Sequence, residues 1–246
     1  TGVLGLVVGL LGFFVMKEPV RGGQDEGPVR QFGLKETFAV LIRNRLFLWL
    51  TLSASFGTYA GLGILQWLPI FFMRSHGLTL TEIGMLFGPA ISLGILVGQL
   101  GGGQIAGLLA RKSLDRPLVW CVMCNLMVIP VYGLALWSGS TGIAIGASFV
   151  AAAIGTSWAP AYLASLQNAC APTLRATAMG LSNVSQSLIA QALVPFFVGF
   201  ASDLLRGELG TDSLRVAIGL GLASNGIAAF CFVLARREMV VDTTRT

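Results

Sequence analysis

The segment GGGQIAG at residues 101–107 has the glycine spacing of a dinucleotide-binding loop, and RKSLDRP follows it at residues 111–117. Glycines in that pattern let a backbone approach a pyrophosphate, which basic side chains could neutralise. The pattern needs a strand before it, a helix opening after it and an acidic residue about 20 positions further on. Here the glycines end a long apolar run and only a short loop follows. We therefore favour close helix packing over nucleotide binding.

The remaining reactive side chains do not assemble into a catalytic or metal site. Cys121 and Cys124 form a C-x-x-C pair, but they lie in an apolar run without a second such pair. His76 is the only histidine in the chain. A zinc site takes about four ligands, and no catalytic triad can be built around one loop histidine. We predict cysteines that pack helices, no metal, no cofactor and no enzymatic activity.

The composition indicates which class of protein holds these residues. Hydrophobic residues make up 54% of the chain, charged residues 11%, and the mean hydropathy is +0.79. Soluble domains carry about 25% charged residues, so this chain has too few charges to cover the surface of a soluble domain. We predict an integral membrane protein. In a membrane protein, the positions of the basic residues relative to the spans matter more than the net charge of +5. We therefore expect no nucleic-acid partner.

Windowed hydropathy predicts where the chain crosses the membrane. The apolar segments are 1–16, 47–73, 80–109, 118–137, 142–166, 176–205 and 214–235. None alternates as a β-barrel strand does, so each must satisfy its backbone as a helix. The first run has 16 residues before Lys17, fewer than the about 20 of a full span. We expect it to be the end of a preceding helix in a fragment, followed by a six-helix domain over 47–235.

The basic residues alternate between connectors. Segments 17–46, 110–117, 167–175 and 236–246 hold 6, 3, 1 and 3 Lys or Arg, and only Arg74, Arg206 and Arg215 lie at the other connectors. The positive-inside rule makes the first set cytoplasmic. We expect a cytoplasmic linker over 17–46 and a cytoplasmic tail over 236–246.

The linker contains its own helical pattern. Leu34, Phe38 and Leu41 fall at i, i+4 and i+7, which is typical of a short amphipathic helix in the membrane interface. The alternative is a site for a regulatory partner.

Two further patterns lie inside the predicted spans. Glycines spaced by four form a groove that another helix can approach closely. The pairs are 84/88, 94/98, 98/102 and 103/107. Polar and aromatic side chains also follow helical spacing, at Ser55, Tyr59 and Gln66, at Trp158, Tyr162 and Ser165, and at Asn183, Ser187 and Gln191, with Gln186 on a neighbouring face. Such stripes line a cavity or hydrogen-bond neighbouring helices. Pro160 is expected to kink its helix.

The motifs together resemble a known family. GGGQIAGLLARKSLDRP is similar to the loop signature of the major facilitator superfamily, and PTLRATAMGL at 172–181 to its P-x-x-R-x-x-A-x-G element. A basic linker before six spans matches the six-plus-six plan of that superfamily. The G-x-L-x-W-x-P element of Gly63, Leu65, Trp67 and Pro69, with LIRNRLFLW and PFFVGFASDLL, resembles spinster-like members.

The resemblance implies an all-α integral membrane fold, in which the six helices form the C-terminal lobe as a 3+3 inverted repeat. It implies a secondary active transporter that moves an amphipathic solute, a lysolipid or sphingoid-type lipid, by alternating access. The expected partners are an N-terminal six-helix lobe, membrane lipid and that solute, in a plasma or bacterial inner membrane. No charged residue lies in the middle of a span, so phosphate binding or proton coupling is expected in the other lobe.

Candidate site residues follow from the stripes and from the resemblance. The expected wall of the substrate cavity is Tyr59, Gln66, Trp67, Trp158, Tyr162, Asn183 and Gln186. The expected loop-signature and gating residues are Gly103, Gly107, Arg111, Arg116, Arg175 and Asp203. Arg175 is expected to cap helix ends. Gly107 stands where the signature has an acid, and Asp115 lies too far along to be assumed its substitute, which puts a charge lock in doubt.

Two alternative functions remain open from the sequence. The first is a major facilitator transporter of a small organic anion, sugar or drug. The second, of another class, is a non-transporting receptor or structural membrane subunit.

Overall fold

The computed structural model describes residues 10–11, 33–59, 61 and 64–245. The chain falls into two units, Thr1–Phe32 and Gly33–Thr246. In the first unit, the two described residues are helical. The rest of the predicted helix end at 1–16, the linker up to residue 32, and Gly63 of the G-x-L-x-W-x-P element lie outside the described residues.

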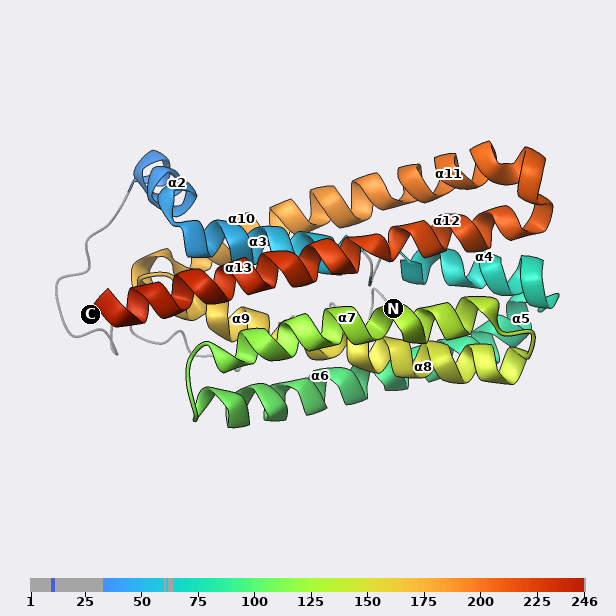
Figure 1. The fold of residues 1–246 in the computed structure, drawn as a ribbon, viewed down its shortest axis with the longest axis horizontal. Coiled ribbons are helices and arrows are strands. Elements are labelled where there is room, and N and C mark those ends of the chain that lie inside the picture. Colours follow the sequence, from blue (N-terminus) through green and yellow to red (C-terminus); the bar gives the residue numbers. More distant parts are fainter. Residues whose placement is uncertain (1–9, 12–32, 60, 62–63, 246) are drawn as a thin grey trace. The chain divides into compact units, whose positions relative to one another are not determined.

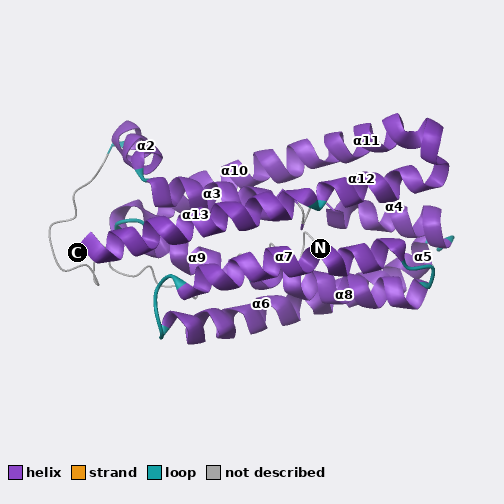
Figure 2. Ribbon diagram, in the orientation of Figure 1, coloured by secondary structure: helices purple, strands orange, loops and turns teal. Residues whose placement is uncertain are grey.

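The second unit is built from helices, and the described residues contain no strand (Figures 1 and 2). The helices are α2 (Leu34–Arg43), α3 (Arg45–Thr58), α4 (Ile64–His76), α5 (Leu80–Glu82), α6 (Gly88–Ala110), α7 (Arg116–Trp137), α8 (Thr141–Ser157), α9 (Ala159–Asn168), α10 (Arg175–Gln186), α11 (Val194–Leu209), α12 (Ser213–Gly221) and α13 (Ala223–Arg245). Ile83–Phe87 and Ser187–Leu193 are π-helical, and they join α5 to α6 and α10 to α11. The predicted all-α fold is confirmed.

Five continuous helical stretches are long and apolar enough to cross a membrane. They are Leu80–Ala110, Arg116–Trp137, Thr141–Asn168, Pro172–Leu209 and Ser213–Val241. Each contains one of the predicted apolar segments from 80–109 onward almost completely. The predicted segment 47–73 has a different form, because α3 ends at Thr58, α4 begins at Ile64, and Tyr59 and Gly61 between them have π-helical backbone.

The glycines of α6 bring its backbone against that of α8. A Cβ added at Gly94 would lie 2.6 Å from the carbonyl oxygen of Phe149, and one at Gly102 would lie 2.1 Å from that of Ser157. At Gly98 the nearest carbonyl oxygen, of Ala153, would be 2.2 Å away. No side chain fits in such a gap, so the prediction of a close-approach groove is confirmed for the stripe 94, 98 and 102.

The same prediction is wrong for the other glycine pairs. A Cβ at Gly84, Gly88 or Gly107 would meet nothing within 4 Å, and one at Gly103 would meet only the Pro160 side chain at 3.9 Å. These glycines lie on other faces of the helix, away from α8. The segment 101–107 therefore contributes one close contact, at Gly102, and it lies inside α6 without the strand that a nucleotide loop needs.

The connectors gather at two opposite ends of the second unit. Figure 1 shows the α6–α7 loop and the C-terminal end of α13 at one end, with the turns between α7 and α8 and between α11 and α12 at the other. The basic connectors and the connectors with few charges are therefore separated in space, as a membrane orientation requires. That the basic end faces the cytoplasm stays a prediction.

The predicted amphipathic helix is present as α2. Its Leu41 is buried and packs inward, whereas Phe38 is 49% exposed. Thr37, rather than Phe38, is the second buried side chain of this helix. The apolar stripe is therefore divided, with one part facing the bundle and Phe38 left at the surface.

Candidate functional site

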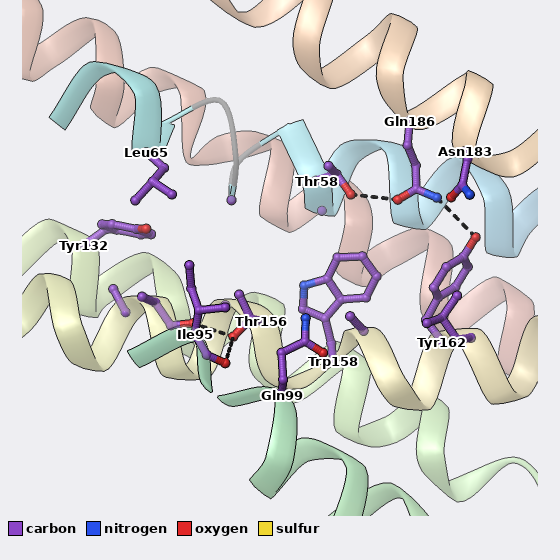
Figure 3. A pocket seen from close by; sticks show the side chains of 17 residues that line it. Thr58, Leu65, Ile95, Gln99, Tyr132, Thr156, Trp158, Tyr162, Asn183 and Gln186 are labelled. Carbon is purple, nitrogen blue, oxygen red and sulfur yellow. Dashed lines mark hydrogen bonds between the residues drawn. The ribbon is translucent and has the colours of Figure 1, made fainter. Parts of the chain in front are cut away.

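A cavity of about 290 Å³ lies between helices α3, α4, α6, α7, α8, α9 and α10 (Figure 3). Its hydrogen-bonding side chains are Thr58, Gln99, Tyr132, Thr156, Trp158, Tyr162, Asn183 and Gln186. The rest of its wall is apolar, with Leu65, Ile95, Ala151, Ala152 and Leu163. No charged side chain of the described residues lines it. The cavity therefore offers uncharged hydrogen-bonding groups beside an aliphatic surface.

A hydrogen-bond network forms the polar part of the wall and joins three helices. The Thr58 hydroxyl of α3 donates to Oε1 of Gln186 on α10 at 3.0 Å. The amide nitrogen of Gln186 donates to the Tyr162 hydroxyl of α9 at 3.4 Å. The Tyr162 hydroxyl also shares a hydrogen bond with the hydroxyl of Ser182. These links fix the orientation of both the phenol and the amide that face the cavity.

Asn183 adds a hydrogen-bonding group without an internal partner. It is exposed and lies beside Gln186 in the cavity wall (Figure 3). Within the described residues its side-chain amide has no hydrogen-bond partner. An amide supplies two donors and one acceptor, so Asn183 is free to bind a polar group that enters the cavity.

Trp158 forms the floor of the cavity at the junction of α8 and α9. Pro160 has no backbone N–H to donate to the preceding turn, and it stands in the first turn of α9, where that donor is not needed. The helix predicted to kink at Pro160 is interrupted at Trp158, because α8 ends at Ser157 and α9 begins at Ala159. The Trp158 ring is buried, with its centroid 5.7 Å from those of Tyr162 and Phe232.

Gly57 on α3 leaves room for the Trp158 ring because it has no side chain. A Cβ at Gly57 would lie 3.1 Å from Cζ2 of Trp158 and 3.2 Å from Oδ1 of Asn125. A larger residue there would push the indole into the cavity. The position of Trp158 is therefore set by α3 as well as by the α8–α9 junction.

The structure divides the predicted cavity residues into two groups. Trp158, Tyr162, Asn183 and Gln186 line the cavity described above. Tyr59, Gln66 and Trp67 are not among its described lining residues, because Tyr59 is half-buried near Gly221, Gln66 is exposed and Trp67 packs beside Gly199. The spacing of Tyr59 and Gln66 assumed 3.6 residues per turn, which the π-helical backbone at Tyr59 and Gly61 does not keep.

Sequence reasoning missed four polar residues of the wall. Thr58, Gln99, Tyr132 and Thr156 line the cavity, although none belonged to a recognised stripe. The Thr156 hydroxyl donates to the Ala152 carbonyl at 2.8 Å. Ile95 and Gln99 both face the cavity from α6 at a spacing of four, which is the one local signal that was present.

The loop-signature residues lie at both ends of the unit. Arg111 and Arg116 are exposed in and after the α6–α7 loop, and Asp203 is exposed on α11. Arg175 donates from Nε to the carbonyl of Gln167 at 2.9 Å. This carbonyl is among the last of α9, so Arg175 lies where a helix-capping side chain is expected.

An ion pair that the sequence did not predict joins the α6–α7 loop to α13. Nε of Arg236 donates to Oδ2 of Asp115 at 2.7 Å, and the Ser113 hydroxyl donates to the other carboxylate oxygen. The hydrogen bonds from Ser113 and Arg236 lower the pKa of the Asp115 carboxyl, so it is charged at neutral pH. The Arg236 side chain is 47% exposed, and such pairs contribute at most about 1 kcal/mol to stability.

Comparisons with known proteins agree with this architecture. The family model of the Major Facilitator Superfamily matches residues 1–195. An MFS-type efflux pump of Mycolicibacterium smegmatis is 30% identical over 208 residues, which are 82% of this chain and 48% of the pump. The sphingosine-1-phosphate transporter SPNS2 of Mus musculus is 25% identical over 242 residues, which are 90% of this chain and 43% of that transporter. The chain thus spans about half the length of these curated relatives.

A solved structure shares the fold. It is the crystal structure of a bacterial homolog to the human lysosomal transporter Spinster in an inward-facing and unoccupied conformation. The TM-score is 0.77 at 22% sequence identity, and the match covers 98% of this chain and 58% of that chain. The inward-facing and occupied form of such a homolog matches with a TM-score of 0.73.

Proposed function

Since the chain belongs to the Major Facilitator Superfamily, we propose that it forms the C-terminal half of a secondary active transporter for an amphipathic solute, a lysolipid or sphingoid-type lipid. The observation that carries this proposal is the chemistry of the cavity wall, where an uncharged hydrogen-bonding network adjoins an aliphatic surface. A ligand that has both a polar head and an apolar chain satisfies both parts of such a wall.

The polar part of the wall suits hydroxyl and amide groups of a ligand. Asn183 has an unpaired amide, and Gln186 and Tyr162 are held in place by Thr58 and Ser182. Preorganised donors and acceptors such as Gln186 and Tyr162 bind a polar head at a lower cost in side-chain ordering. Aliphatic side chains such as Leu65, Ile95 and Leu163 then face the apolar chain.

The charge of the substrate would be balanced outside this half. A phosphate in a low-dielectric cavity needs a positive partner, and no charged side chain of the described residues lines the cavity. We therefore assign the phosphate partner and any proton-coupling group to the proposed N-terminal half.

This half would move as one body during alternating access. The carbonyl contacts of Gly94, Gly98 and Gly102 fix α6 against α8, and the Asp115–Arg236 pair ties the α6–α7 loop to α13. Transporters built from two repeats rock one rigid bundle against the other around a central site. We place that site at the cavity that Trp158 and Tyr162 line.

A drug-like apolar solute is the second candidate. The relative that is 30% identical is named an efflux pump, and an uncharged wall is compatible with an uncharged apolar substrate. A small organic anion is less compatible with this wall because it has no apolar chain to cover the aliphatic side chains.

A competition experiment separates these candidates. The full-length transporter, reconstituted in proteoliposomes, is loaded with labelled lysophospholipid, and its export is measured in the presence of unlabelled competitors. We expect a second lysolipid and a sphingoid base to compete, and soluble organic anions and sugars to have no effect. Competition by the soluble anions alone would contradict the proposal, and competition by an apolar drug without lysolipid transport would favour the second candidate.

A further inference from the structure

A second cavity, separate from the one described above, lies on the surface of the helix bundle, between α7 and α13. Its volume is about 670 Å³, and it shares no lining residue with the central cavity. Two arginines, Arg236 and Arg237, face it together with valines from both helices. We propose that this groove binds one anionic phospholipid, with its phosphate at the two arginines and an acyl chain along Val119, Val122 and Val233.

The placement of the groove matches the structure of a lipid. Both Arg116–Trp137 and Ser213–Val241 are stretches long and apolar enough to cross a membrane. Val119 and Val122 follow Arg116, the first residue of α7, by three and six positions, which is about 4.5 and 9 Å along the helix axis. The arginines thus lie at the level of a headgroup, and the α7 valines lie deeper, at the level of a chain.

The ion pair with Asp115 holds the Arg236 side chain in a position from which it can bind a phosphate. Its Nε donates to the carboxylate at 2.7 Å, which holds the guanidinium in place and leaves its two terminal nitrogens for another acceptor. An arginine with a fixed fork binds phosphate oxygens bidentately. Arg237 is exposed and has no ion-pair or hydrogen-bond partner among the described residues, so its charge is free for the ligand.

The local charge favours an anion. The described residues 110–118 and 232–241 contain five basic side chains, Arg111, Lys112, Arg116, Arg236 and Arg237, and two acidic ones, Asp115 and Glu238. Basic grooves between membrane helices at the cytoplasmic side bind anionic headgroups. A soluble phosphate would use only the arginines and would leave the valine surface uncovered, whereas a phospholipid covers both.

The test compares lipid binding to the full-length transporter and its variants. Purified protein is stripped of lipid in mild detergent and titrated with phosphatidylglycerol or with phosphatidylcholine of the same acyl chains, and bound lipid is counted by native mass spectrometry. Arg237→Gln is expected to weaken phosphatidylglycerol binding roughly fivefold, the effect of one basic residue at an anionic surface. Phosphatidylcholine binding is expected to be unchanged.

Three controls make the outcome decisive. Arg206→Gln removes an exposed arginine at the opposite end, on α11, and is expected to have no effect, whereas an equal loss there would show diffuse attraction and overturn the proposal. Unchanged binding in Arg237→Gln and in the Arg236→Gln/Arg237→Gln double variant would also overturn it.

Glycerol 3-phosphate, a headgroup without a chain, is expected not to displace the bound lipid, and complete displacement would show a phosphate site instead. Tyr162→Phe is expected to bind lipid normally, which separates this proposal from the proposed transport function.

Discussion

Gly102→Ala in the full-length transporter is expected to lower strongly the amount of folded protein in the membrane. The new methyl group would lie 2.1 Å from the carbonyl oxygen of Ser157 and 2.7 Å from its Cα. These are backbone atoms of α8, so no side chain can rotate to make room, and the two helices would have to separate. Overpacking in a core costs typically about 1–3 kcal/mol and more where the backbone must move, so we expect a loss of about 3 kcal/mol or more.

The neighbouring residue provides the matched control. Gly101 lies on the same helix, and a Cβ there would meet nothing within 4 Å. Gly101→Ala is expected to be neutral or to stabilise α6, because alanine has a higher helix propensity by about 1 kcal/mol. The measurement is the amount of monodisperse protein after extraction and its apparent melting temperature. Equal stability of the two variants would contradict the packing of α6 on α8.

Trp158→Ala is expected to reduce transport of an amphipathic substrate at least tenfold. The indole forms the cavity floor, and its ring stacks edge-on against Tyr162. Loss of an aromatic surface that a ligand would bury costs about 1.5–3 kcal/mol, and each 1.4 kcal/mol is a factor of ten in binding. The measurement is the initial rate of lysolipid export at several substrate concentrations, together with the melting temperature.

Conservative variants separate binding from folding, because Trp158 is itself buried. Trp158→Phe keeps an aromatic floor and is expected to retain most of the transport activity. Tyr162→Phe keeps the ring and removes the hydroxyl that Gln186 and Ser182 share, so we expect a rise in KM of a few-fold, from about 1 kcal/mol of lost hydrogen bonding. A folded Trp158→Ala variant with unchanged transport would show that this cavity is not the substrate site.

The sequence predicts the spans well because a helix in a bilayer depends on its own composition. Every peptide group must be satisfied within the segment, so the apolar runs from residue 80 onward give the membrane-spanning helices directly. Trp158 and Tyr162 also follow from spacing, since they lie four residues apart at the start of α9, whereas Gln186 is expected on a neighbouring face of α10 and lines the cavity together with Asn183.

Other features depend on which parts of the chain meet, and spacing does not determine that. Tyr59 and Gln66 share a face only if the helix between them is regular, and the backbone there is π-helical at Tyr59 and Gly61. Gly101 and Gly102 are adjacent residues of the same type, so the sequence does not distinguish them, yet only Gly102 faces α8. The Asp115–Arg236 pair joins residues 121 positions apart, for which no local pattern exists.

An amphipathic substrate in the cavity lined by Asn183 would shield this position from water-soluble reagents. The most direct measurement is the rate at which a water-soluble maleimide labels Asn183→Cys in the full-length transporter, with and without lysolipid. The four native cysteines of this chain are buried, so they contribute little labelling, and Val184→Cys, exposed beside it but not among the cavity's lining residues, serves as the control. We predict that lysolipid slows labelling at position 183 and leaves position 184 unchanged. Equal labelling of Asn183→Cys with and without lysolipid would contradict the account.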